Sequence, residues 1–244
     1  MKRVLRNFLS LLLLVGALSL SSFAQAQSGW ENKPYQQWTM EDLEKILSDS
    51  PWAQTREKGL VVMNSGSSDF ALSLPASPER VTLRLRSGLP IRVALMRLRQ
   101  MKSKYDKMSE KEKADFDART KTLLECPACA DNYVVALSPP PGESKGVPTI
   151  FRNMSLAAAR QSVEISNDAG EKRELVHFEP PKTPGGEVTF FFARLNQKGE
   201  PLLTPTSKKL FITFDTKIFG DHPSLVRRFE FDVQKMLIKG QVSF

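Results

Sequence analysis

The chain has 244 residues, of which 41% are hydrophobic and 25% are charged, and its formal net charge is +8. A chain of this length forms one large domain or two small ones and buries a core of its own, so its two cysteines are not needed to hold it together. Only two histidines occur, so any histidine-dependent hydrolase would have to use one of them.

The first 26 residues have the pattern of a secretory signal peptide. Three basic residues precede an apolar run at 8–20, and Ala24 and Ala26 stand at the −3 and −1 positions of a cleavage site. The run is shorter than the roughly 20 residues that span a bilayer, and no later stretch is apolar enough to cross one. We therefore expect an exported protein, periplasmic or secreted, in which residues 27–244 form a single α+β domain without a transmembrane segment.

A short helix is predicted near the start of the mature chain. Thr39 is a good N-cap, the apolar residues after it recur at helical spacing, and Pro51 stops the pattern, which predicts a helix at 40–49. Strand-like residues follow at 59–63 and at 70–74.

The next strand and helix carry most of the positive charge. In VTLRLRS (81–87) apolar residues alternate with polar and basic ones, which predicts a half-buried strand with a basic outer face. Between Glu79 and Lys107 the sequence holds nine basic and two acidic residues. This local excess predicts a basic patch that binds a partner, although a solvated face that keeps the protein soluble is the plainer interpretation. The predicted binding residues are Arg84, Arg86, Arg92, Arg97 and Arg99.

A helical hairpin is predicted at about 90–125. Pro90 suits the first turn of one helix, and Ser109 with Glu112 forms a capping box for the next. The hairpin would be inserted between the basic strand and the β-rich part of the chain, which begins at about 132.

Both cysteines lie directly after the hairpin, in Cys126-Pro127-Ala128-Cys129. A redox centre is favoured where a helix begins, because the helix N-terminus stabilises a thiolate. Here a helix ends and Glu125 adds negative charge, which disfavours a thiolate. A structural zinc site needs four ligands, and nothing in the spacing of the histidines supplies them. We favour a disulfide between Cys126 and Cys129 that pins the turn, and we predict no metal and no cofactor.

Residues from about 132 to 244 alternate between short strands and turn signals such as NDAG and NQKG. The strands predicted at 188–195, 209–214 and 227–233 have alternating apolar faces that would share one core. This pattern is typical of a β-sandwich. We predict an α+β fold with an immunoglobulin-like β-sandwich, an N-terminal helix and the inserted helical hairpin.

No catalytic residue is predicted. The sequence has no GxSxG, HExxH or phosphate-binding glycine loop, His177 fits a strand and His222 fits a turn. An exported chain without a nucleic-acid motif is a poor nucleic-acid binder. We expect a non-enzymatic binding or scaffold protein of the cell envelope, whose basic surface meets an acidic envelope protein or an anionic glycan or lipid surface. The alternative is an envelope enzyme, such as a thiol–disulfide protein that uses Cys126 and Cys129.

Four segments, WTMEDLEKILSDSPWA, RSGLPIRVALMRL, DNYVVAL and LNQKGEPLLTP, resemble an uncharacterised family of predicted exported bacterial proteins. The resemblance covers most of the mature chain. It implies export and a single folded unit, and it implies no catalytic residue because the family has no assigned function.

Overall fold

The computed structural model describes residues 29–57, 80–144, 147, 149–215 and 228–244. The chain divides into two compact units, Met1–Pro34 and Tyr35–Phe244, which are treated separately. In the first unit the Lys33 N–H donates a hydrogen bond to the Trp30 carbonyl oxygen at 3.2 Å.

Some predictions lie outside the described residues. These are the signal peptide at 1–26, the strands at 59–63 and 70–74, and the turn that holds His222.

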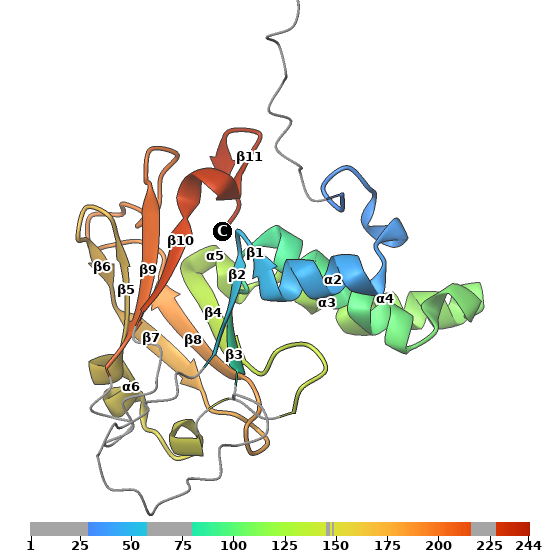
Figure 1. Ribbon diagram of the computed structural model, residues 1–244, viewed down its shortest axis with the longest axis horizontal. Helices are drawn as coiled ribbons and strands as arrows, with labels where there is room; N and C mark the ends of the chain where they lie inside the picture. The colour runs from blue at the N-terminus through green and yellow to red at the C-terminus, as the bar shows by residue number, and fades with distance from the viewer. Residues whose placement is uncertain (1–28, 58–79, 145–146, 148, 216–227) are drawn as a thin grey trace, which may run out of the picture. The chain divides into compact units, whose positions relative to one another are not determined.

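Two antiparallel sheets form the centre of the unit Tyr35–Phe244 (Figure 1). The larger sheet has the strand order β1-β2-β3-β4-β8-β7, and the smaller has the order β10-β9-β5-β6. The strands of the larger sheet, in that order, are Asp49–Ser50, Ala53–Glu57, Arg80–Leu85, Asn132–Ser138, Val188–Ala193 and Leu175–Glu179. Those of the smaller sheet are Arg228–Asp232, Lys209–Phe214, Val163–Asn167 and Lys172–Arg173. The short strands β11 (Leu237–Ile238) and β12 (Gln241–Val242) pair separately.

Phenylalanines from both sheets meet in the core. Phe190 of β8 is fully buried, and its ring centroid lies 5.9 Å from that of Phe214 in β9. Phe214 in turn lies 6.1 Å from Phe229 of β10. The alternation predicted for these three strands is thus confirmed, and each buried phenylalanine contributes about 1.5–3 kcal/mol of apolar transfer energy.

The described helices occur where local sequence signals begin and end them. They are η1 (Tyr35–Gln37), α2 (Met40–Ser48), α3 (Leu89–Lys102), η2 (Tyr105–Lys107), α4 (Glu110–Glu125), α5 (Ala128–Asp131), η3 (Thr149–Arg152), α6 (Leu156–Ser162) and η5 (Val233–Met236). Thr39 caps α2, and the predicted capping box of Ser109 and Glu112 begins α4. Helices α3 and α4 form a hairpin between β3 and β4 that extends away from both sheets (Figure 1). The mixture of helices and antiparallel sheets confirms the predicted α+β class.

The prediction that the 81–87 strand has a basic outer face is wrong. In β3 both sets of alternating side chains are buried, and Thr82 and Arg84 are 0% and 6% exposed. The reason is that α2 covers the face expected to meet water, while β2 lies beside β3 in the same sheet and shields its edge. Arg84 Nε donates to the Leu47 carbonyl oxygen of α2 at 2.6 Å, and Thr82 Oγ1 lies 2.8 Å from Thr55 Oγ1 of β2.

Candidate functional site

Arg84, the first of the five predicted binding arginines, is part of the folded interior. Besides its bond to Leu47 of α2, its guanidinium donates to Ser138 Oγ at the end of β4 and to the Pro139 carbonyl oxygen. Burial lowers the pKa of Arg84 to about 10. Because the guanidinium joins a helix to a strand end, this arginine stabilises the fold and does not lie on the surface.

Two more of the predicted arginines are held by carboxylates. Arg86 Nη1 lies 2.5 Å from Glu187 Oε1. Arg97 Nη2 lies 3.4 Å from Asp106 Oδ2, and the Arg97 side chain is only 10% exposed. These two charges are therefore already neutralised by carboxylates of the same chain. Together with the burial of Arg84, this means that the five arginines do not form one basic surface.

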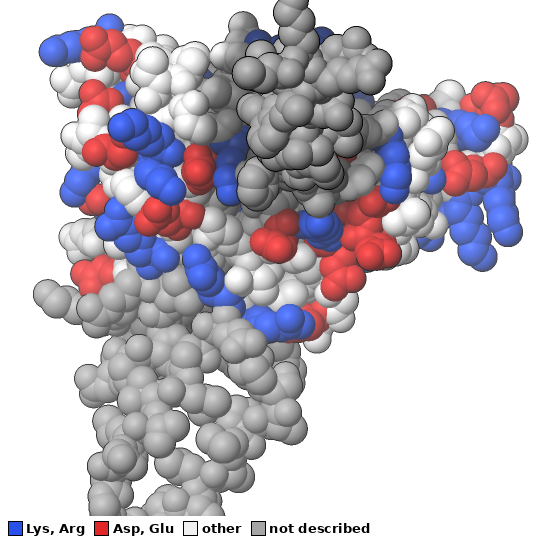
Figure 2. All heavy atoms as spheres, turned by 45° about the horizontal axis from the view of Figure 1, so that its top comes forward, with Lys and Arg blue, Asp and Glu red and all other residues white. Residues whose placement is uncertain are grey.

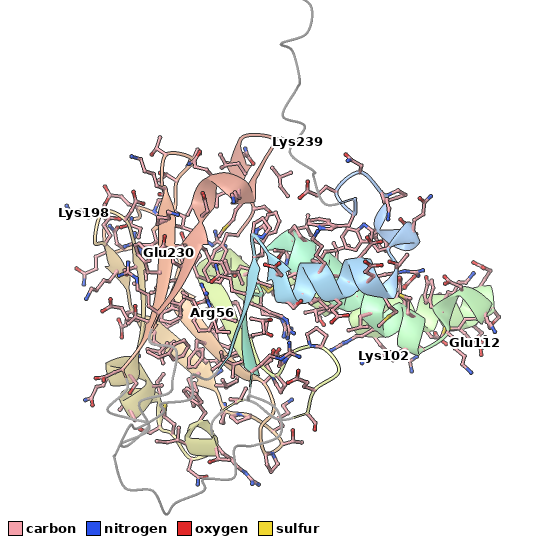
Figure 3. All side chains as sticks on the ribbon, in the orientation of Figure 1. Arg56, Lys102, Glu112, Lys198, Glu230 and Lys239 are labelled. Atoms are coloured by element: carbon pink, nitrogen blue, oxygen red, sulfur yellow. A yellow bond between two sulfur atoms is a disulfide. The ribbon has the colours of Figure 1, made fainter. Side chains whose placement is uncertain are left out.

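The exposed cations lie farther along the hairpin. We call Arg99, Lys102, Lys104 and Lys107 the arm cations. All four are exposed, and none forms an ion pair with a residue in the described part of the chain. Figure 3 shows Lys102 on the helical hairpin, away from both sheets. Acidic side chains lie among the basic ones on the face drawn in Figure 2, so the surface there has mixed charge.

The hairpin that carries these cations is braced internally. The rings of Tyr105 and Phe116 meet edge to face at 5.2 Å, and the Tyr105 hydroxyl donates to Asp117 Oδ2 at 2.8 Å. That hydrogen bond is the main cause that raises the pKa of Tyr105 to about 12. These contacts link η2 to α4, and they hold the arm cations on an ordered support.

Arg92, the remaining one of the five predicted arginines, lies near the start of α3, at the end of the hairpin that adjoins the sheets. Its Nη1 donates to the Leu124 carbonyl oxygen at the end of α4, and its Nε is buried without a hydrogen-bond partner among the described residues. Burial lowers the pKa of Arg92, and the nearby charge of Arg194 lowers it further. Arg92 therefore belongs to a second group of residues, around the cysteines.

The predicted disulfide joins Cys126 and Cys129. Cys126 ends α4 with a left-handed backbone at φ 45°, and its N–H donates to the Thr122 carbonyl oxygen. Cys129 lies in the single turn α5, which the sequence analysis did not predict. The bond therefore closes the turn between the helical hairpin and β4.

Arg194, which directly follows β8, was missed by the sequence analysis. Its Nε and Nη2 donate to the Cys129 carbonyl oxygen at 3.2 and 3.0 Å, and Nη2 also donates to the Phe244 carbonyl oxygen at 2.8 Å. The guanidinium lies 4.8 Å from the centre of the Tyr133 ring. Nothing in the spacing of the chain relates residue 194 to residue 129, because β-sheet pairing of β8 with β4 brings them together.

His177 does not resemble a catalytic base. It lies on the edge strand β7, its ring centroid is 5.0 Å from that of Phe191, and its Nε2 is 3.8 Å from Glu179 Oε1. In the described ranges no cluster of three or more histidine, cysteine or acidic side chains is placed to hold a metal ion.

Comparisons with known protein families, with curated proteins and with solved structures found no match. The resemblance to a family of predicted exported proteins therefore stays a prediction. Among the helices that the structure describes, none combines the length and the apolar character that crossing a membrane requires.

Proposed function

We propose that this protein is an exported binding or scaffold protein of the cell envelope, and that it meets an acidic partner protein through the arm cations. The observation that carries the proposal is the exposure of Arg99, Lys102, Lys104 and Lys107 on a hairpin that extends from the sheets. Unpaired surface cations accelerate the encounter with an acidic partner and help to orient it.

An acidic protein fits this surface better than a uniformly anionic lipid or glycan. Exposed carboxylates lie among the hairpin's cations, including Glu110 and Asp115 of α4. A uniformly negative surface would be repelled by these groups, whereas a protein partner can place acidic and basic groups opposite them. The arm cations replace the five-arginine surface predicted from sequence, because Arg84 and Arg97 are buried.

We propose further that the two sheets form an immunoglobulin-like β-sandwich that supports the helical hairpin carrying the arm cations. The order β3-β4-β8-β7 corresponds to strands A-B-E-D of that fold, and β10-β9-β5-β6 corresponds to G-F-C-C′. In this correspondence the helical hairpin is an insertion between strands A and B. Such a sandwich serves as a rigid scaffold for inserted recognition elements.

The test is cross-linking in the native cell with a photoreactive reagent, followed by measurement of binding to the recovered partner. The variant changes all four arm cations to glutamate. The matched control makes the same change at four exposed lysines away from the helical hairpin, which are Lys235 of η5 and the loop residues Lys182, Lys198 and Lys239. Both variants alter the net charge equally.

We expect the arm variant to lose the cross-linked partner and to bind it at least about tenfold more weakly, while the control binds normally. Native binding should also weaken as salt is added. Equal losses in both variants would show that net charge alone is responsible, and an arm variant that still binds would refute the role of the arm cations.

A further inference from the structure

We propose that the Cys126–Cys129 disulfide is a redox centre that oxidises a pair of thiols in another polypeptide while it is itself reduced. We call Cys126-Pro127-Ala128-Cys129 the cysteine turn. The inference rests on the position of two arginines, Arg92 and Arg194, beside it. It goes beyond the proposed binding function and does not depend on the arm cations.

The cysteine turn is accessible in an asymmetric way. Pro127 and Ala128 between the cysteines are exposed, Cys126 is half-buried, and Cys129 is buried at 8% exposure. An incoming thiolate therefore reaches Cys126 more easily than Cys129. The asymmetry assigns Cys126 as the attacked sulfur and Cys129 as the leaving group.

Two cations flank this turn. The Arg194 guanidinium bonds to the carbonyl oxygen of Cys129 itself, and the Arg92 guanidinium bonds to the carbonyl oxygen of Leu124, two residues before Cys126. The two guanidinium groups are near enough for the charge of Arg194 to lower the pKa of Arg92. Clustered cations stabilise a thiolate beside them, which makes a thiol pair a better leaving and attacking group.

In the sequence, the end of a helix and the charge of Glu125 disfavour a thiolate at this turn, and the structure shows a cation beside each of these two features. The end of α4 exposes carbonyl oxygens, which disfavour negative charge, but Arg92 binds one of them at Leu124. The Glu125 carboxylate lies 3.3 Å from Lys121 Nζ, which offsets its charge. The local field is therefore more positive than the sequence around the cysteines predicts.

The proposed exchange balances as follows. A thiolate of the substrate polypeptide attacks Cys126 Sγ, forms a mixed disulfide and breaks the Cys126–Cys129 bond, so that Cys129 leaves as a thiolate and takes up a proton. The second substrate thiol loses its proton and attacks the substrate sulfur of the mixed disulfide, which breaks the bond to Cys126 and releases Cys126 as a thiolate that takes up a proton. The substrate gains a disulfide, and this protein gains the two electrons and two protons that the substrate loses.

The first test equilibrates the oxidised full chain with mixtures of reduced and oxidised glutathione and counts free thiols after acid quenching. A redox centre becomes reduced reversibly within the range of these mixtures, whereas a structural disulfide stays oxidised in all of them. Resistance to every glutathione mixture would overturn the proposal.

The second test measures the rate of Cys126 alkylation against pH in the reduced protein. In Arg194→Gln we expect the profile to move to higher pH and the alkylation rate at pH 7 to fall about tenfold, because a neighbouring opposite charge shifts a pKa by about one unit or more. Arg194→Lys keeps the charge and should behave nearly as the native protein.

Arg119→Gln, at an exposed position on α4, is the control and should leave the profile unchanged. If Arg194→Gln does not fold, as judged by thermal unfolding, Arg92→Gln gives the same test from the other side of the turn. A pH profile that neither arginine variant moves would overturn the role of the cations, and it would leave the arm-binding experiment unaffected.

Discussion

The buried guanidinium of Arg84 donates to three oxygen acceptors, two of them in buried hydrogen bonds and one in a partly buried hydrogen bond. Two are main-chain carbonyl oxygens, at Leu47 and Pro139, and the third is the Ser138 hydroxyl. Removing a donor from buried acceptors costs more than the hydrogen bond itself, because the acceptors stay desolvated. At the residue scale, an arginine that the sequence places in a predicted surface patch is thus a stability determinant.

We predict that Arg84→Met lowers the free energy of unfolding by about 1–3 kcal/mol, since methionine keeps the stem of the side chain but donates to none of the three oxygens. Arg99→Met is the matched control from the same predicted patch, and its exposed position predicts a change within about 0.5 kcal/mol. Urea unfolding of both variants measures the difference. Similar losses would mean that Arg84 contributes no more than a surface arginine.

At the scale of elements, the sequence predicts best those features that depend on neighbours along the chain. The capping box of Ser109 and Glu112 and the alternation in β8 and β9 are local, and the structure confirms them. The second face of β3 could not be predicted, because α2 covers it from more than 30 residues away. Arg194 was missed for the same reason, since only strand pairing places it beside Cys129.

The start of α4 offers a test of how the hairpin is held. This helix buries few side chains, Phe116 and Thr120 among its described residues, so its first turn depends on the cap. We predict that Ser109→Ala raises the hydrogen-exchange rate of the Glu112 and Lys113 amides about fivefold, because loss of an N-cap costs about 1 kcal/mol. These two amides donate to the Ser109 hydroxyl and carbonyl oxygen. Ser109→Thr keeps the hydroxyl and should exchange nearly as the native chain does. An unchanged rate in the alanine variant would show that the cap does not limit fraying.

At the scale of the unit Tyr35–Phe244, stability and recognition occupy different places. The sheets are held together by aromatic residues such as Phe190, whose ring meets those of Phe151, Phe178 and Phe214. The arm cations make no ion pair within the described ranges. Reversing their charge should therefore change binding without changing the unfolding free energy, which separates a surface effect from a folding defect in the experiment proposed above.

Two neighbouring phenylalanines on β8 provide the test of this division. Phe190 is fully buried between the sheets, whereas Phe191 points to the other face, is half-buried and meets the His177 ring. We predict that Phe190→Ala lowers the unfolding free energy by about 3–5 kcal/mol, through lost apolar burial and the cavity that remains. Phe191→Ala should cost clearly less, because its site is open to solvent and leaves no closed cavity. Urea unfolding followed by circular dichroism measures both, and equal losses would mean that the contact between the two sheets is not the main core of the protein.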